Sequence, residues 1–274
     1  MIHVQNGVPH PEVDEASVLS MRRSPLLYGP SLEDRQAHLE EIHLGAAMHN
    51  RGNVILGIYG MWHGDPSSHR PSVTMDLGLA ISHDAMHFHE PIPGFRFIPG
   101  YEEDGLTVGY GPALMQGQGM ENVDDRTLYW YSLWRNDGQV RLATWDRDRF
   151  GYVRPGKART PAKLISCPIR IPDGRQKVLL NIDGVGDYAG VRVELLDLKF
   201  RPVPGYSGED CVEVREAGLR VPVRWRGNDM LPEGGRPIRL QVDFGRRSPS
   251  SPRPDDVRFF AAYIGPDEAR EGRG

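Results

Sequence analysis

The amino-acid sequence predicts an all-β protein, and three observations lead to that prediction. Glycine (32 residues) and proline (23 residues) make up about a fifth of the 274-residue chain, which indicates many turns. Apolar residues alternate with polar ones over short runs, and few segments have the spacing of an amphipathic helix. In the second half of the chain these runs follow one another at turn-separated intervals, as in antiparallel β proteins.

The bulk composition is that of a soluble globular protein, and it excludes several classes of partner. The formal net charge is −4 at pH 7 and Lys and Arg are spread along the chain, so nothing favours nucleic acid or an anionic membrane. No apolar run is long enough to span a bilayer, and the N-terminal MIHVQNGVPHPEVDE lacks the features of a signal peptide. We therefore expect a cytoplasmic protein without nucleic-acid or membrane partners.

No motif in the sequence indicates a metal or a cofactor. Cys167 and Cys211 have no CxxC or Cys/His ligand spacing, and we expect two reduced, buried thiols rather than a disulfide. His87 and His89 share one face of an expected strand, but two ligands do not make a metal site. We expect neither metal nor cofactor.

Two regions in the first half of the chain share one pattern. In Asn50–Trp62 and again in Val123–Trp134, a polar tight turn precedes a strand that ends in Trp. In Asp76–Pro91 and Gln139–Pro155 a second strand of the form Leu-x-Leu-Ala precedes a charged turn and an aromatic residue followed by Pro. Such a repeat predicts β-propeller blades, although antiparallel hairpins of unrelated folds can look alike.

The residues before this repeat resemble the end of an earlier blade. Met21–Pro30 has the same position relative to the next unit as His89–Pro99. Ser31–Glu41 begins with a serine suited to an N-cap and could hold one helical turn. We therefore expect the chain to begin inside a blade.

From about Thr160 the sequence predicts an antiparallel β-sandwich of short strands. In Val191–Phe200 apolar residues alternate with charged ones, so one face of that strand is buried and the other is wet. Arg246–Asp256 is typical of a loop, and the C-terminal DEAREGRG of a frayed tail. The expected domains are a propeller part over residues 1–158 and a sandwich over residues 159–274.

The run LGLAISHDAMHFHEP (Leu77–Pro91) resembles a strand pair of five-bladed propeller glycoside hydrolases of the invertase/levanase-like and arabinanase/xylosidase-like families. RGNVILGIYGMWHG and MENVDDRTLYWYSLWR are similar to other blade strands of these families. The resemblance covers roughly Leu26–Pro155, and several members carry a C-terminal β-sandwich. It implies that this chain holds the last blades of a five-bladed propeller, followed by an antiparallel β-sandwich.

The resemblance also implies hydrolysis of O-glycosidic bonds by paired carboxyl groups at a central pocket. In these families the acid lies several positions before an Asn/Asp-Gly turn, a region that holds Glu41 and His43 in the first blade and Glu121 in the second. Glu41 is the first candidate for the general acid, because apolar neighbours would raise its pKa. The alternatives are a solvated turn for Glu41, and solvent exposure or an arginine partner for Glu121.

Gln116 and Gln118 are predicted to bind sugar, because an amide offers both a donor and an acceptor to neighbouring hydroxyls. Gly117 and Gly119 would let the backbone approach a ligand. The alternative is a glycine-rich β-bulge without a ligand.

Trp62, Trp130 and Trp134 could supply aromatic platforms for sugar rings, although core packing is the more common use of such residues. Asp76 begins a strand, where it either holds a turn or reaches the pocket. Trp62, Trp130 and Asp76 are therefore candidate substrate-binding residues. His43 is a further candidate of this kind.

We therefore expect a carbohydrate-active protein of the glycoside hydrolase type whose partner is a carbohydrate substrate. Two blades cannot close a propeller, so further blades would precede this chain or come from another one, and the chain alone would be inactive. The alternative is a non-catalytic glycan-binding module. A third class is a structural or assembly protein that uses exposed sheet edges.

Overall fold

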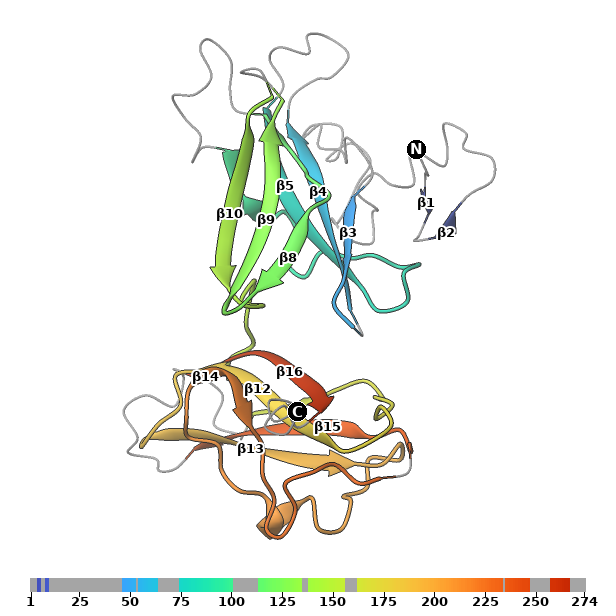
Figure 1. Ribbon diagram of the computed structural model, residues 1–274, viewed down its shortest axis with the longest axis vertical. Helices are drawn as coiled ribbons and strands as arrows, with labels where there is room; N and C mark the ends of the chain where they lie inside the picture. The colour runs from blue at the N-terminus through green and yellow to red at the C-terminus, as the bar shows by residue number, and fades with distance from the viewer. Residues whose placement is uncertain are drawn as a thin grey trace, which may run out of the picture. The chain divides into compact units, whose positions relative to one another are not determined.

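The chain is an assembly of short antiparallel β-sheets (Figure 1). The computed structural model describes residues 4–5, 8–9, 46–52, 54–63, 74–100, 113–134, 138–155, 162–233, 235–246 and 257–266. Within these ranges there are strands, turns and a 3₁₀ turn at Gly208–Asp210, but no α-helix. No helix in this part of the chain is therefore long and apolar enough to cross a membrane. The all-β prediction is confirmed.

The chain forms two compact units. Unit 1 comprises Met1–Val123 and Thr127–Thr144, and unit 2 comprises Asp124–Arg126 and Trp145–Gly274. The division therefore falls before Trp145, whereas the change in sequence pattern predicts a domain boundary after residue 158. The reason is local bonding, because Val153 exchanges backbone hydrogen bonds of 2.8 and 2.9 Å with Phe259, deep in the second half of the sequence.

The first sheet of unit 1 is a four-stranded antiparallel meander in which each strand pairs with the next. Its strands are β3 (Ala47–Asn50), β4 (Ile55–His63), β5 (Thr74–Ser82) and β6 (Arg96–Ile98). A two-stranded pair, β1 (Val4–Gln5) and β2 (Val8–Pro9), forms a separate small sheet.

Gly78, in the Leu-x-Leu-Ala run, has a packing role. It lies opposite Tyr59 in the register of β4 and β5. A Cβ atom at this position would lie 2.4 Å from Cζ of the buried Tyr59 ring. The glycine therefore lets the ring lie across β5, much as aromatic residues cover strand glycines in other sheets.

The second sheet is built around β9 (Arg126–Leu133), which lies between β10 on one side and β7 and β8 on the other. Its other strands are β7 (Leu114–Met115), β8 (Met120–Val123) and β10 (Val140–Asp146). Burial alternates along β9, and Tyr129, Tyr131 and Leu133 face inward. The strand expected from the aromatic run is found there.

The two four-stranded sheets are separate but touch within unit 1. Ala113, just before β7, forms a parallel bridge with Met75 of β5, and both residues are 1% exposed. Met115 and Trp134 pack against this pair. His49 of β3 also contacts Tyr129 of β9, with the ring centroids 6.0 Å apart and the rings nearly perpendicular. The two stretches are thus neighbouring sheets, although the described residues contain no closed ring of blades.

Unit 2 contains two three-stranded antiparallel sheets that share one hydrophobic core. One sheet has the order β11 (Ala162–Ile165), β15 (Arg239–Arg246), β13 (Ala189–Leu196). The other has the order β14 (Gly218–Pro222), β12 (Gln176–Asp183), β16 (Arg258–Pro266). The alternation expected in β13 is present, because Val191, Val193 and Leu195 are all fully buried.

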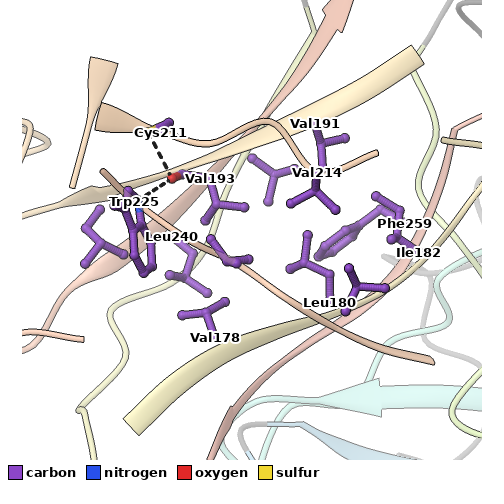
Figure 2. Packing of buried hydrophobic residues seen from close by; sticks show 14 of the residues in the cluster. Val178, Leu180, Ile182, Val191, Val193, Cys211, Val214, Trp225, Leu240 and Phe259 are labelled. Atoms are coloured by element: carbon purple, nitrogen blue, oxygen red, sulfur yellow. Dashed lines mark hydrogen bonds between the residues drawn. The ribbon is translucent and has the colours of Figure 1, made fainter. Parts of the chain in front are cut away.

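Trp225 is the largest side chain enclosed by this core. It is 2% exposed, and its Nε1–H donates a hydrogen bond of 2.8 Å to the Val193 carbonyl. The Cys211 thiol donates to the same oxygen over 3.2 Å, and Figure 2 shows both groups directed at it. Burial raises the pKa of the Cys211 thiol to about 12, so this cysteine is inert at neutral pH.

Cys167 differs from the expectation of two buried thiols. Both cysteines are free, as expected, but Cys167 is exposed. It lies just beyond the end of β11, where the chain leaves the core. The sequence pattern does not show which way a small side chain beyond the end of a strand faces. The sequence therefore could not predict that Cys167 is exposed while Cys211 is buried.

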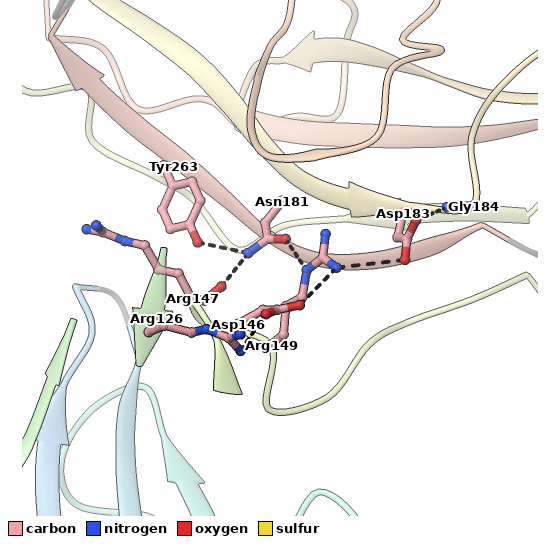
Figure 3. A network of polar contacts seen from close by, with 8 residues as sticks. All are labelled: Arg126, Asp146, Arg147, Arg149, Asn181, Asp183, Gly184 and Tyr263. Carbon is pink, nitrogen blue, oxygen red and sulfur yellow. Dashed lines mark hydrogen bonds and ion pairs between the residues drawn. The ribbon is translucent and has the colours of Figure 1, made fainter. Parts of the chain in front are cut away.

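A polar network around the buried Asn181 explains why the segment after Trp145 belongs to unit 2 (Figure 3). Asn181 of β12 is fully buried, and its amide donates 2.7 Å to the Arg147 carbonyl and accepts 3.0 Å from Nε of Arg149. The Arg149 guanidinium lies 3.7 Å from carboxylate oxygens of both Asp146 and Asp183. Because buried polar groups must be hydrogen-bonded, this network fixes the segment to β12.

Candidate functional site

The predicted site residues fall into two groups. Glu41 and His43 lie outside the described residues, and Trp62 lies in β4 but its side chain is likewise outside the described part. The remaining candidates, all in unit 1, are Asp76, Gln116, Gln118, Glu121 and Trp130.

Gly117 and Gly119 lie between β7 and β8, two strands that both pair with β9, and close approach to β9 requires both glycines. A Cβ on Gly117 would lie 1.8 Å from the Trp130 carbonyl oxygen, and one on Gly119 would lie 3.2 Å from the Trp130 ring. The Gly119 carbonyl accepts a 3.0 Å hydrogen bond from the Trp130 amide. These contacts favour the β-bulge interpretation of the glycines, with the backbone approaching β9 rather than a ligand.

The polar side chains of the same segment remain accessible to different degrees. Gln116 is partly buried and Gln118 is exposed. Glu121, in β8, is also exposed, and one of its oxygens accepts a 2.9 Å hydrogen bond from the next backbone amide, that of Asn122. An exposed carboxylate needs no special partner, so the solvent-facing alternative describes Glu121 in this structure.

Asp76 and Trp130 have clear structural surroundings. Asp76 is 5% exposed, and one oxygen accepts 2.6 Å from the Gly100 amide while the other lies 3.0 Å from Nε of Arg96. Asp76 therefore ties β5 to β6 and to the turn that follows, which favours the turn interpretation. Trp130 is 38% exposed and lies over Gly119, so part of its ring is available as a platform.

His49 and Tyr129 form a contact that the sequence analysis did not single out. Nε2 of His49 is buried and has no hydrogen-bond partner in the described part of the chain. Burial, and then the charge of Arg51, lower the pKa of His49, so the imidazole is neutral at pH 7. Burial raises the pKa of the Tyr129 phenol, whose oxygen accepts 3.0 Å from the Gly117 amide. Tyr129 of β9 therefore links His49 of β3 to Gly117, between β7 and β8.

The chemistry of these groups is that of neutral hydrogen-bond donors and acceptors rather than of charged side chains. A neutral imidazole and an amide each carry one donor side and one acceptor side, and a phenol can do both. We define the β3–β7/β8 cluster as His49, Gln116, Gly117 and Tyr129. The signal of this cluster in the sequence was weak. His49 lies directly beside the tight turn in which Asn50 Oδ1 accepts a hydrogen bond from the Gly52 amide. The family pattern instead places the functional residue several positions before this turn.

The histidines of the Leu77–Pro91 run belong to a turn. Nδ1 of His87 lies 2.7 Å from Oδ2 of Asp84, and hydrogen bonds from the His87 side chain and backbone hold the pKa of Asp84 well below its usual range. In the described ranges no group of three or more His, Cys, Asp or Glu side chains is arranged to hold a metal ion.

Comparison with known proteins leaves the family open. No protein-family model and no curated protein matches this chain. The resemblance of the blade-like strands to propeller glycoside hydrolases therefore stays a prediction, and the functional inference depends on the geometry of the chain itself.

Proposed function

We propose that this chain is part of a carbohydrate-active protein of the glycoside hydrolase type. Unit 1 would supply the last blades of a five-bladed β-propeller, and unit 2 the C-terminal antiparallel β-sandwich. The observation that carries the proposal is the arrangement of unit 1, in which two separate antiparallel sheets meet through the Met75–Ala113 bridge and the His49–Tyr129 contact. The shared core of the two sheets of unit 2 supports the sandwich.

The proposed reaction is hydrolysis of an O-glycosidic bond by a pair of carboxyl groups. Glu41 and Glu121 are the candidates on this chain, and the resemblance implies further acids on blades that precede it. Gln116, Gln118 and His43 would bind sugar hydroxyls, and the neutral His49 adds a group of the same kind. The exposed part of Trp130 would support a sugar ring.

The open face of the second sheet supports additional blades. β10 is at the edge of that sheet, and its apolar side chains Val140 and Leu142 are 68% and 50% exposed. Exposed apolar side chains on an edge strand favour pairing or packing with another element. In a closed propeller the next blade would cover this face.

A non-catalytic glycan-binding module is the second candidate. The exposure of Glu121 favours it, since a catalytic carboxyl group is usually shielded from water and held by partners. Gln116, Gln118 and Trp130 would then hold a glycan without cleaving it.

Activity assays on two forms of the protein separate these functions. We expect this chain alone to release no nitrophenol from aryl glycosides, because the paired carboxyl groups are incomplete. In a form extended by the blades that we propose, Glu41→Gln and Glu121→Gln should each lower turnover by about 10²-fold or more while sugar binding is retained.

The outcomes are distinct. Turnover by this chain would contradict the incomplete site. An extended parent that binds sugar without cleaving it would support the binding module instead.

A further inference from the structure

Unit 2 has a polar hollow of about 590 Å³ on its surface. Loops that are distant in the sequence form it, and the side chains important here are Arg175, Tyr206, Asn228, Asp229, Leu231 and Glu233. This volume lies within the range of small-molecule sites in proteins. None of these residues belongs to the site proposed for unit 1.

The loops around this hollow are held in place by the fold beneath them. Trp225 and Asn228 exchange two backbone hydrogen bonds of 2.9 and 3.0 Å, which close a tight turn. The Asn228 side-chain amide donates 3.3 Å to the Gly205 carbonyl, which links the turn to the loop of Tyr206. The buried Leu231 donates its amide 2.8 Å to the Gln176 carbonyl. A site fixed in this way loses little entropy when a ligand binds.

The charged side chains of the hollow are free for a ligand. In the described part of the chain, Arg175, Asp229 and Glu233 make no hydrogen bond or ion pair. Some other charged side chains of unit 2 are paired locally, as in Asp197–Arg201 at 2.7 Å and Glu213–Arg215 at 2.6 Å. The hollow thus combines unused donors and acceptors.

The mixture of charges indicates the class of ligand. One guanidinium beside two carboxylates does not favour an anion, and two carboxylates without a third acidic or His ligand do not make a metal site. Donors and acceptors placed around one hollow suit neighbouring hydroxyl groups, each of which both donates and accepts. The Tyr206 ring, held edge-on against Trp225 at 5.2 Å, adds a rigid aromatic surface.

We propose that this hollow binds a neutral saccharide, as a second carbohydrate site independent of the one proposed for unit 1. The Asp229 and Glu233 carboxylates accept hydrogen bonds from sugar hydroxyls, and the Arg175 guanidinium donates hydrogen bonds to sugar hydroxyl oxygens. The inference does not rest on hydrolase activity, because every residue that carries it belongs to unit 2.

The test is a titration of the whole chain with three probes: xylobiose, arabinobiose and a fructan trisaccharide. Amide resonances of Gly227, Asn228 and Asp229 report the hollow, and calorimetry gives the dissociation constant. We expect at least one probe to shift these resonances. Asp229 and Glu233 are exposed, so their substitution should not disturb the fold. The double variant Asp229→Asn, Glu233→Gln should raise the dissociation constant of the sugar that binds about tenfold.

The matched control is Glu209→Gln, an exposed acid in the 3₁₀ turn outside the hollow, which should leave the dissociation constant unchanged. The proposal is overturned if none of the three sugars shifts these amides, or if inorganic phosphate does so instead. It is also overturned if Gln116→Ala abolishes sugar binding while the double change in the hollow does not. That last result would leave the site on unit 1 intact.

Discussion

Trp225→Ala should lower the free energy of unfolding of unit 2 by about 3–5 kcal/mol. The side chain is 2% exposed in the core between the two three-stranded sheets, so its removal leaves a large cavity. The Val193 carbonyl also loses its 2.8 Å hydrogen bond from the indole. Urea denaturation, followed by amide hydrogen exchange at residues of β12 and β13, measures this effect on unit 2 separately from unit 1.

Trp130→Ala is the matched control for this substitution. Trp130 is 38% exposed on β9, and its removal should cost no more than about 1 kcal/mol in the same assay applied to unit 1. Equal effects of the two substitutions would mean that Trp225 is not enclosed in the core as described.

Gly117→Ala should destabilise unit 1 by roughly 3 kcal/mol or more. The added methyl group would lie 1.8 Å from the Trp130 carbonyl oxygen, and backbone cannot move aside as a flexible side chain can. Either the β7–β8 junction or β9 must shift, and the hydrogen bond from the Gly117 amide to Tyr129 would be strained. Urea denaturation followed by hydrogen exchange in β9 measures the loss.

Gly57→Ala, also in a strand of unit 1, provides the control. Its nearest neighbour would be Ala46 Cβ at 3.4 Å, an ordinary contact, so we expect a change within about 0.5 kcal/mol. A Gly117→Ala protein as stable as this control would show that β7–β8 and β9 do not approach each other so closely.

Much of the fold could be predicted because burial repeats along a strand with a period of two. The alternation in Val191–Phe200 identified β13, and the aromatic run before Trp134 identified β9. The division before Trp145 could not be predicted in this way. It depends on side-chain bonds from Asn181 to residues more than thirty positions away, which leave no local pattern.

The site was harder to predict, because the role of a polar residue depends on what faces it. The glycines at positions 117 and 119 suggested close approach correctly, but the partner is Trp130 and not a ligand. Asp76 could be placed at a strand start, whereas its partners Arg96 and Gly100 follow only from the pairing of β5 with β6.

Two groups of residues were missed for related reasons. His49 lies in a four-residue strand, too short to show a period. The residues of the hollow in unit 2 lie in turn-rich loops such as Gly227–Glu233, where no periodicity exists and only the folded chain brings Arg175 and Tyr206 alongside.

The most direct test of the proposed function is whether sugar binds at the β3–β7/β8 cluster. Xylobiose, arabinobiose and a fructan trisaccharide would be added to the whole chain, and the amide resonances of Gly117 and Gln118 and the imidazole resonances of His49 would be followed. We predict that one of these sugars shifts all three, and that Gln116→Ala removes the shifts while the exposed control His89→Gln retains them. Resonances that stay unchanged at saturating concentrations of every probe would contradict a carbohydrate site in unit 1.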